Sequence, residues 1–185
     1  MGLITDKGTP IGRLVAAGVA VDSWLFHAAY NRRGPRLSAL IMWLFTKSGD
    51  GPLYMALCLG LLATDAPRAR ELSLVAAVAF GIERTLYLVL KRAFRRARPY
   101  AKFQHVRSTI KPLDRYSFPS GHAAAACVMA TLVSLFYPAF AGIAWAWAVG
   151  VAYSRVYHGV HFPADVAAGL VLGHVCARLG LVAVM

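Results

Sequence analysis

The stretch Tyr116-Ser117-Phe118-Pro119-Ser120-Gly121-His122 stands directly before an apolar run that continues to Tyr137. Proline and serine are typical of the first positions of a helix, so the pattern predicts that a helix begins here. Gly121 leaves its backbone N–H open, and free N–H groups at a helix start attract anions. His122 then lies in the first turn, where an imidazole can give or take a proton near neutral pH. The stretch therefore predicts an anion site with a proton donor at the mouth of an apolar helix.

The composition indicates a membrane protein. The chain has 185 residues, of which 58% are hydrophobic and only 15% charged, a balance too apolar for an ordinary soluble domain. Its length suits a single domain, predicted to cover residues 1–185. The net charge is +12, but the basic residues lie in short loops between apolar runs. They are expected to face lipid headgroups and an anionic substrate, not nucleic acid.

Apolar runs divide the second part of the chain into membrane segments. Five segments are predicted to cross the membrane: 51–64, 72–90, 119–136, 140–155 and 165–184. Several are shorter than the roughly 20 residues of a typical span, but their many Gly and Ala residues suit close helix packing. We therefore predict an all-α, polytopic transmembrane bundle of five to six membrane helices, with residues 51–185 as its catalytic part.

The first 46 residues are predicted to form an N-terminal interfacial or re-entrant region. The apolar run at 37–45 is too short to span a bilayer. Residues 11–30 are amphipathic toward their end, which favours an interfacial helix, with a marginal span as the alternative. With the five later crossings in this order, the loops 91–118 and 156–164 meet the helix start at Ser120 on one side of the membrane.

A basic cluster precedes that helix start. Lys91 and Arg98 are seven residues apart, so on a continuing helix they would share one face, with Pro99 ending the helix. The other basic residues of the cluster are predicted to contact lipid headgroups: Arg92, Arg95 and Arg96. Within the segment 72–90, Glu83 and Arg84 are predicted to form a structural pair outside the site, with the alternative that Arg84 lines the path beneath the phosphate.

A second charged group follows the segment 140–155. Arg155 ends that segment and Asp165 begins the next, so the loop between them holds His161 between a cation and a carboxylate. A carboxylate that binds one imidazole nitrogen fixes the tautomer and leaves the other nitrogen basic. Taken alone, a structural Arg–Asp pair with an incidental histidine explains this pattern as well. Asp114, in the loop before the predicted helix start at Ser120, is predicted to gate access to the site or to contact a lipid headgroup.

Together the groups meet the needs of phosphoryl transfer. The charge on a transferring phosphoryl group calls for fixed cations, and Lys91, Arg98 and Arg155 supply them. His161 offers an oriented nucleophile, and His122 offers an acid for the departing oxygen. The sequence contains no cluster of carboxylates suited to Mg²⁺, so no metal and no cofactor are expected.

Three motifs in this order resemble the signature of the type 2 phosphatidic acid phosphatase superfamily. They are Lys-x6-Arg-Pro from Lys91, Pro-Ser-Gly-His from Pro119, and Ser-Arg-x5-His-x3-Asp ending at Asp165. That superfamily includes bacterial isoprenoid-diphosphate phosphatases and, more distantly, vanadium-dependent haloperoxidases. The resemblance implies a metal-independent helical phosphatase with a phosphohistidine intermediate. It makes His161 the nucleophile, His122 the general acid and Asp165 the orienting carboxylate, and it makes the phosphate binders Lys91, Arg98, Ser120, Gly121 and Arg155.

The substrate is expected to be a lipid phosphate. The candidates are undecaprenyl diphosphate, phosphatidylglycerophosphate, phosphatidic acid and a phosphorylated lipid glycan. The alternative is a non-enzymatic anion-binding channel or carrier whose cations line a pore, although a pore has no need of an oriented nucleophile. A vanadate-dependent oxidase would share the site type, but a membrane bundle favours phosphorylated lipids. The sequence makes no prediction of oligomeric state.

Two arguments disagree about which membrane face carries the site. Most Lys and Arg residues fall on the catalytic side, so the positive-inside rule places that side in the cytoplasm. Several of these cations are there for chemistry, however, and bacterial proteins of the resembled type and size usually work on the outer face. We predict a multi-pass protein of a bacterial-type inner membrane with the site facing outward, against the charge count.

Overall fold

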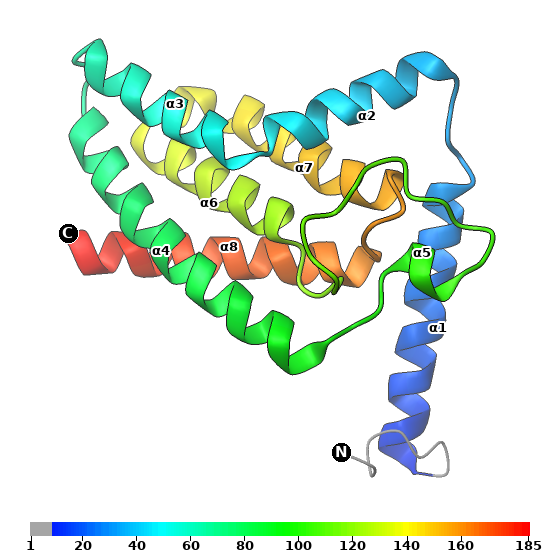
Figure 1. Cartoon of the computed structure of the whole chain (residues 1–185). Helices are drawn as coiled ribbons and strands as arrows, with labels where there is room; N and C mark the ends of the chain where they lie inside the picture. Colours follow the sequence, from blue (N-terminus) through cyan, green and yellow to red (C-terminus); the bar gives the residue numbers. More distant parts are fainter. Residues whose placement is uncertain (1–8) are drawn as a thin grey trace.

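The computed structural model describes residues 9–185 as a set of helices joined by short loops (Figure 1). The described part of the chain forms no β-strand, so the prediction of an all-α fold is confirmed. The helices are α1 (Pro10–Tyr30), α2 (Arg36–Ser48), α3 (Gly51–Ala63), α4 (Ala69–Phe94), α5 (Pro99–Lys102), α6 (Gly121–Phe136), the short 3-10 helix η2 (Pro138–Phe140), α7 (Ala141–Tyr157) and α8 (Pro163–Val184).

Helix α6 is the centre of the bundle and packs against α4, α7 and α8. Its small side chains let α8 come close: a Cβ added at Gly173 would lie 2.2 Å from the carbonyl oxygen of Ala124. A Cβ at Gly169 would lie 2.4 Å from the carbonyl oxygen of Ser120. Only glycine permits this approach. The starts of α6 and α8 therefore lie side by side, and the Ser120 N–H donates to the Asp165 carbonyl at 2.9 Å.

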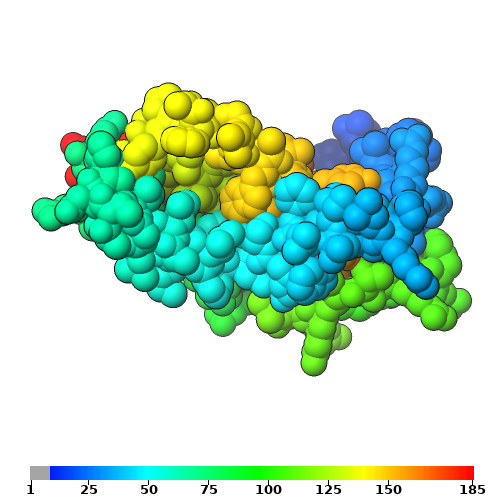
Figure 2. All heavy atoms as spheres, turned by 90° about the horizontal axis from the view of Figure 1, so that it is seen from above, coloured from blue at the N-terminus to red at the C-terminus, as the bar shows by residue number. Residues whose placement is uncertain are grey.

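Helices α2 and α3 run one after the other along the bundle and are separated by a break at Gly49 and Asp50 (Figures 1 and 2). Helix α2 packs on α7, and α3 packs on α4. The sequence prediction treated 37–45 as a separate short segment. The structure instead joins it end to end with α3, so the break lies partway along the bundle, where its backbone faces the start of α6.

Helix α1 lies across one end of the bundle instead of along it (Figure 1). Phe26 on one face is fully buried among Val106 and Phe162. The opposite face is open, and Leu14 and Trp24 are 73% and 68% exposed. Helix α1 therefore contacts the bundle only near its C-terminal half, at the end where the predicted site residues lie.

Helix α4 ends earlier than the sequence predicted. It stops at Phe94, because Arg95 adopts a left-handed conformation with φ of 47°. The residue before Pro99 is held extended, as expected for a residue that precedes proline. Lys91 and Arg98 therefore do not share one helical face, and that prediction was wrong. The chain instead turns after Arg95 and returns Arg98 toward the bundle.

Two stretches are long and apolar enough to cross a membrane: α4 with its continuation to Lys102, and α8. Their mean hydropathies are 1.6 and 1.8, and α3 and α6 are shorter apolar helices. Large apolar side chains are exposed along the outside of the bundle: Met55, Leu74, Val89, Val171 and Val182. Such a surface suits contact with lipid. The number of crossings stays a prediction.

Candidate active site

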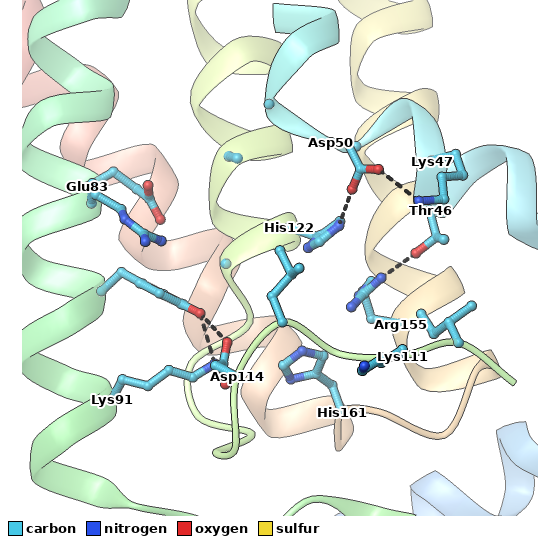
Figure 3. Close-up of a pocket in the computed structure, with 18 of the residues that line it drawn as sticks. Thr46, Lys47, Asp50, Glu83, Lys91, Lys111, Asp114, His122, Arg155 and His161 are labelled. Carbon is cyan, nitrogen blue, oxygen red and sulfur yellow. Dashed lines mark hydrogen bonds and ion pairs between the residues drawn. The ribbon is translucent and has the colours of Figure 1, made fainter. Parts of the chain in front are cut away.

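A cavity of about 940 Å³ lies between the α2–α3 break, α4, α6 and α7. Six of the eight predicted site residues line it: Lys91, Arg98, Gly121, His122, Arg155 and His161. The other two, Ser120 and Asp165, are fully buried behind its wall. Figure 3 shows His122, Arg155 and His161 turned toward the same space from three different segments.

His161 lies in the short loop between α7 and α8 and is 2% exposed. Its Nδ1 faces Asp165 Oδ2 at 3.8 Å, an electrostatic contact longer than a hydrogen bond. Its Nε2 lies 3.3 Å from Nη1 of Arg98. Burial is the main reason that the pKa of His161 falls to about 3. Asp165 raises that pKa, and the charges of Arg155 and Arg98 lower it further. The imidazole is therefore neutral at pH 7, as a nucleophile must be.

Lys91 and Arg98 meet at one carboxylate, that of Asp114. Lys91 Nζ and Arg98 Nη2 each lie 2.9 Å from Asp114 Oδ1, and the hydroxyl of Tyr87 donates to Oδ2 at 2.6 Å. Burial would raise the pKa of Asp114, but hydrogen bonds from Tyr87 and Lys91 and the charges of Lys91 and Arg98 lower it to about 2. The sequence prediction gave Asp114 a gating or headgroup role. In the structure it binds two of the three predicted phosphate-binding cations.

Arg155 is the third cation and has a different environment. It is 4% exposed, and one of its terminal nitrogens donates to the Thr46 hydroxyl of α2. Its Nε has no hydrogen-bond partner among the described residues, and neither does Oγ of the buried Ser120. Buried polar atoms are almost always paired in native proteins. Two unpaired donors beside the same cavity are therefore suited to bind an anion.

His122 also has a carboxylate partner, one that the sequence prediction missed. Its Nε2 lies 3.0 Å from Asp50 Oδ1, while Lys47 binds the other oxygen of Asp50 at 3.2 Å (Figure 3). Asp50 precedes α3 at the break after α2. Gly49 and Pro52 indicate a turn at this point of the sequence. Nothing in the sequence, however, indicates that the turn places Asp50 against His122.

The position of Arg96 contradicts the prediction that it contacts lipid headgroups. We expected it at the membrane surface among headgroups, yet its Nη1 donates to Asp165 Oδ1 at 2.6 Å, and its Nη2 binds Asp22 of α1. The bend after Arg95 turns the next side chain inward. Glu83 and Arg84, which were predicted to form a structural pair, both line the cavity from the middle of α4.

Within residues 9–185 there is no group of three or more His, Cys, Asp or Glu side chains placed to hold a metal ion. The positive charges at this cavity come from the side chains themselves. Two imidazoles, three fixed cations and buried donors at one cavity are a set suited to phosphoryl transfer.

Comparison with known proteins agrees with this geometry. The family model described as the PAP2 superfamily matches residues 71–185. The chain is 38% identical to an undecaprenyl-diphosphatase from Sulfolobus acidocaldarius over 116 residues, which are 57% of this chain. The match spans only 52% of that relative, about half of its length.

Two solved structures resemble the whole bundle. A crystal structure of Aquifex aeolicus LpxE is 30% identical, with a TM-score of 0.79 over 87% of this chain and 94% of that one. A transmembrane PAP2-type phosphatidylglycerolphosphate phosphatase from Bacillus subtilis is 29% identical, with a TM-score of 0.69 over 89% of this chain and 84% of that one. The family-model match to residues 71–185 contains all eight predicted site residues.

Proposed function

Because the chain belongs to the PAP2 superfamily, we propose that it is a membrane phosphatase that hydrolyses a phosphomonoester or diphosphate of a lipid. The observation that carries the proposal is the cavity itself, on which His161, His122 and three cations converge. A channel or carrier would not need the close approach of Arg98 to His161 Nε2 at 3.3 Å. That contact is instead suited to hold a phosphate oxygen beside an attacking nitrogen.

The proposed reaction begins with attack of His161 Nε2 on phosphorus. The bond between this phosphorus and the leaving oxygen breaks, and that oxygen takes a proton from His122; the leaving oxygen belongs to the lipid alcohol in a phosphomonoester and to the lipid monophosphate in a diphosphate. A phosphohistidine forms, and water hydrolyses it while His122, now neutral, accepts the proton of the water. The equatorial phosphate oxygens are held by Lys91, Arg98, Ser120, Gly121 and Arg155. Because Nδ1 faces Asp165, Nε2 is the nitrogen free to attack.

No divalent metal is part of this proposal. The developing charge on the phosphoryl group needs positive partners, and Lys91, Arg98 and Arg155 are already placed around the cavity. Asp114 holds two of them, Lys91 and Arg98. A phosphate group would replace that carboxylate as their partner when it enters.

The substrate class follows from the apolar surroundings of the cavity. A phosphorylated headgroup at the cavity leaves a lipid tail to extend along the exposed apolar side chains of the bundle. The relatives named above differ in substrate, one an undecaprenyl-diphosphatase and another a phosphatidylglycerolphosphate phosphatase. We keep an isoprenoid diphosphate and a glycerophospholipid phosphate as the two candidate substrates.

We propose residues 51–185 as the catalytic bundle of a multi-pass inner-membrane protein, with five or six crossings and the site on the outer face. The test of topology is one cysteine at Lys102 in a cysteine-free background, labelled in intact cells with an impermeant maleimide. Labelling before lysis supports an outward site. Labelling only after lysis would place the site in the cytoplasm, as the positive-inside rule predicts.

The test of function is phosphate release by the purified protein from a panel of undecaprenyl diphosphate, phosphatidylglycerophosphate and phosphatidic acid. Release should continue in EDTA, and vanadate should inhibit it by occupying the phosphate site. Loss of activity in EDTA that Mg²⁺ restores would contradict the metal-independent mechanism. No release from any lipid phosphate would contradict the proposed function.

A further inference from the structure

Arg96 joins two carboxylates that come from distant parts of the chain. One terminal nitrogen donates to Asp165 Oδ1 at 2.6 Å, and the other donates to Asp22 of α1. The Asp165 side chain is fully buried, while those of Asp22 and Arg96 are 9% and 25% exposed. A planar guanidinium can hold two carboxylates in fixed directions, because its N–H groups form a rigid fork.

The position of Arg96 is fixed from several sides. Its guanidinium carbon lies 4.2 Å from the centre of the Phe162 ring, a cation–π contact. Its carbonyl oxygen accepts the N–H of Ser117 at 2.8 Å, just before the motif that begins α6. The left-handed residue Arg95 ends α4 and directs Arg96 inward. The side chain is therefore held by the fold and is not a mobile surface cation.

Asp22 extends the same network to the start of α8. Its Oδ1 accepts the backbone N–H of Ala164 at 2.8 Å, while its other oxygen binds Arg96. N–H groups in the first turn of a helix have no partner within the helix, so a carboxylate there is stabilising. Helix α1 thus contacts both the first turn of α8 and the arginine that holds Asp165.

The two oxygens of Asp165 have different tasks in this arrangement. Oδ1 is bound by Arg96, whereas Oδ2 accepts the N–H of Phe162 at 2.8 Å and faces His161 Nδ1. Rotation of the carboxylate would break both hydrogen bonds. Arg96 therefore fixes which oxygen of Asp165 faces His161.

We propose that Arg96 is a positioning residue of the phosphatase reaction, holding Asp165 in the orientation that directs His161 Nε2 at the phosphate. Asp22 of α1 supports Arg96 in this role. The proposal rests on the proposed function, and it gives α1 a part in the reaction. The sequence motifs do not include either residue.

The first measurement is turnover by Arg96→Gln, Arg96→Lys and Asp22→Asn in the full chain. Arg96→Gln should lower kcat about 10- to 100-fold and change KM little, since positioning acts on the transition state. Arg96→Lys keeps the charge without the fork and should fall between wild type and Arg96→Gln. Asp22→Asn should lower kcat about threefold, because Arg96 still reaches Asp165. Arg107→Gln is the matched control: it removes an exposed arginine of the loop after α5 and should leave kcat unchanged.

The second measurement does not depend on turnover. The pKa of His161 is followed by NMR of ¹⁵N-histidine-labelled protein, in wild type, Arg96→Gln and the control Arg107→Gln. The charged groups that face His161 are Arg98, Arg155 and Asp165, and none of them is changed in these variants. Without the positive charge of Arg96, the carboxylate of Asp165 is less neutralised and acts more strongly on His161, so the pKa of His161 should rise by about one unit in Arg96→Gln alone.

The outcomes separate the explanations. A folded Arg96→Gln protein with wild-type kcat and an unshifted His161 would overturn the proposal. Loss of thermal stability with no change in His161 would make Arg96 merely structural and would overturn it as well. If Arg96→Gln does not fold, Arg96→Lys and Asp22→Asn give the same two readouts. A wild-type protein that releases no lipid phosphate would refute the proposed function, while the NMR shift still tests the contact of Arg96 with Asp165.

Discussion

The two histidines of the cavity each face a carboxylate, but the two pairs are built differently. His161 and Asp165 are four residues apart, in a loop and the helix that follows it, and both are almost fully buried. His122 and Asp50 are 72 residues apart, from α6 and the break before α3, and their side chains are 20% and 38% exposed. One pair is local and shielded from water, and the other is assembled from distant segments near the cavity opening.

The difference matches the two proposed roles. A nucleophile must stay neutral and point in one direction, and burial with a fixed carboxylate achieves both. A proton donor must exchange its proton with solvent during each turnover, so partial exposure is useful to it. The pair that must orient the nucleophile is formed by two residues close together in the sequence. The pair needed for proton exchange depends on how the bundle packs.

The largest effect is expected from removal of the nucleophile. His161→Ala should lower kcat by about 10³-fold or more, because no other described side chain replaces Nε2 beside Arg98. The measurement is phosphate release with the preferred lipid, together with the thermal midpoint. His161→Gln serves as a second variant that fills the buried space, and His105→Ala is the control for loss of a loop histidine. A folded His161→Ala protein with near-native turnover would refute the proposed mechanism.

The carboxylate behind His161 should give the next largest effect. Asp165→Asn keeps the shape of the side chain, but its amide can favour the wrong imidazole tautomer, so kcat should fall about 10²-fold or more. It also weakens the contact with Arg96 at 2.6 Å. Trapping of ³²P-labelled enzyme after acid quench should show slower formation of the phosphohistidine. Formation at the wild-type rate would mean that Asp165 does not orient the nucleophile.

The sequence predicted both residues of the local pair, but only His122 of the distant one. Arg155, His161 and Asp165 follow one another within eleven residues, at the end of one helix, in the connecting loop and at the start of the next helix, so their meeting could be predicted. The helix start at Ser120 was likewise predictable from residue types. By contrast, Asp50 gives no signal by itself, because its partner depends on where the break between α2 and α3 lies against α6.

Charge patterns were misread for a related reason. Arg92, Arg95 and Arg96 look alike in sequence, as basic residues at the end of an apolar helix. Only the left-handed bend at Arg95 decides that Arg96 turns inward to Asp165. Asp114 was also ambiguous, because a loop carboxylate near cations can either close a site or hold those cations. The packing of helices and loops decides such cases, and the spacing of residue types along the sequence does not predict that packing.

The distant pair predicts a leaving-group effect of moderate size. Asp50→Asn removes the carboxylate beside His122, so transfer of a proton to the leaving oxygen should slow about tenfold for an alkyl lipid phosphate. Hydrolysis of p-nitrophenyl phosphate should change much less, because its leaving group needs no acid. Lys47→Gln, which removes the other partner of Asp50, is the control and should act weakly on both substrates. Equal losses on the two substrates would mean that Asp50 has no part in proton transfer.

The smallest effect concerns Asp114, which holds the cations of the site. Its pKa in the folded protein, about 2, lies below the ordinary value of 3.8. Its contribution to stability is therefore fully present above about pH 4 and is lost as the pH falls through about 2. Because the side chain is 35% exposed, solvent screening reduces this contribution to about 1 kcal/mol. Asp114→Asn should accordingly lower the thermal midpoint by about 2–4 °C at pH 7.

The same change should strengthen anion binding, which separates Asp114 from an ordinary stabilising residue. Asp114→Asn removes the carboxylate that competes with an anion for Lys91 and Arg98, so vanadate should inhibit about three- to tenfold more tightly. Asp65→Asn, a matched change of an exposed loop aspartate at the other end of α4, should alter neither the midpoint nor inhibition. Weaker vanadate inhibition in Asp114→Asn would mean that Asp114 holds the cations in their phosphate-binding positions. In that case Asp114 would not compete with phosphate for Lys91 and Arg98.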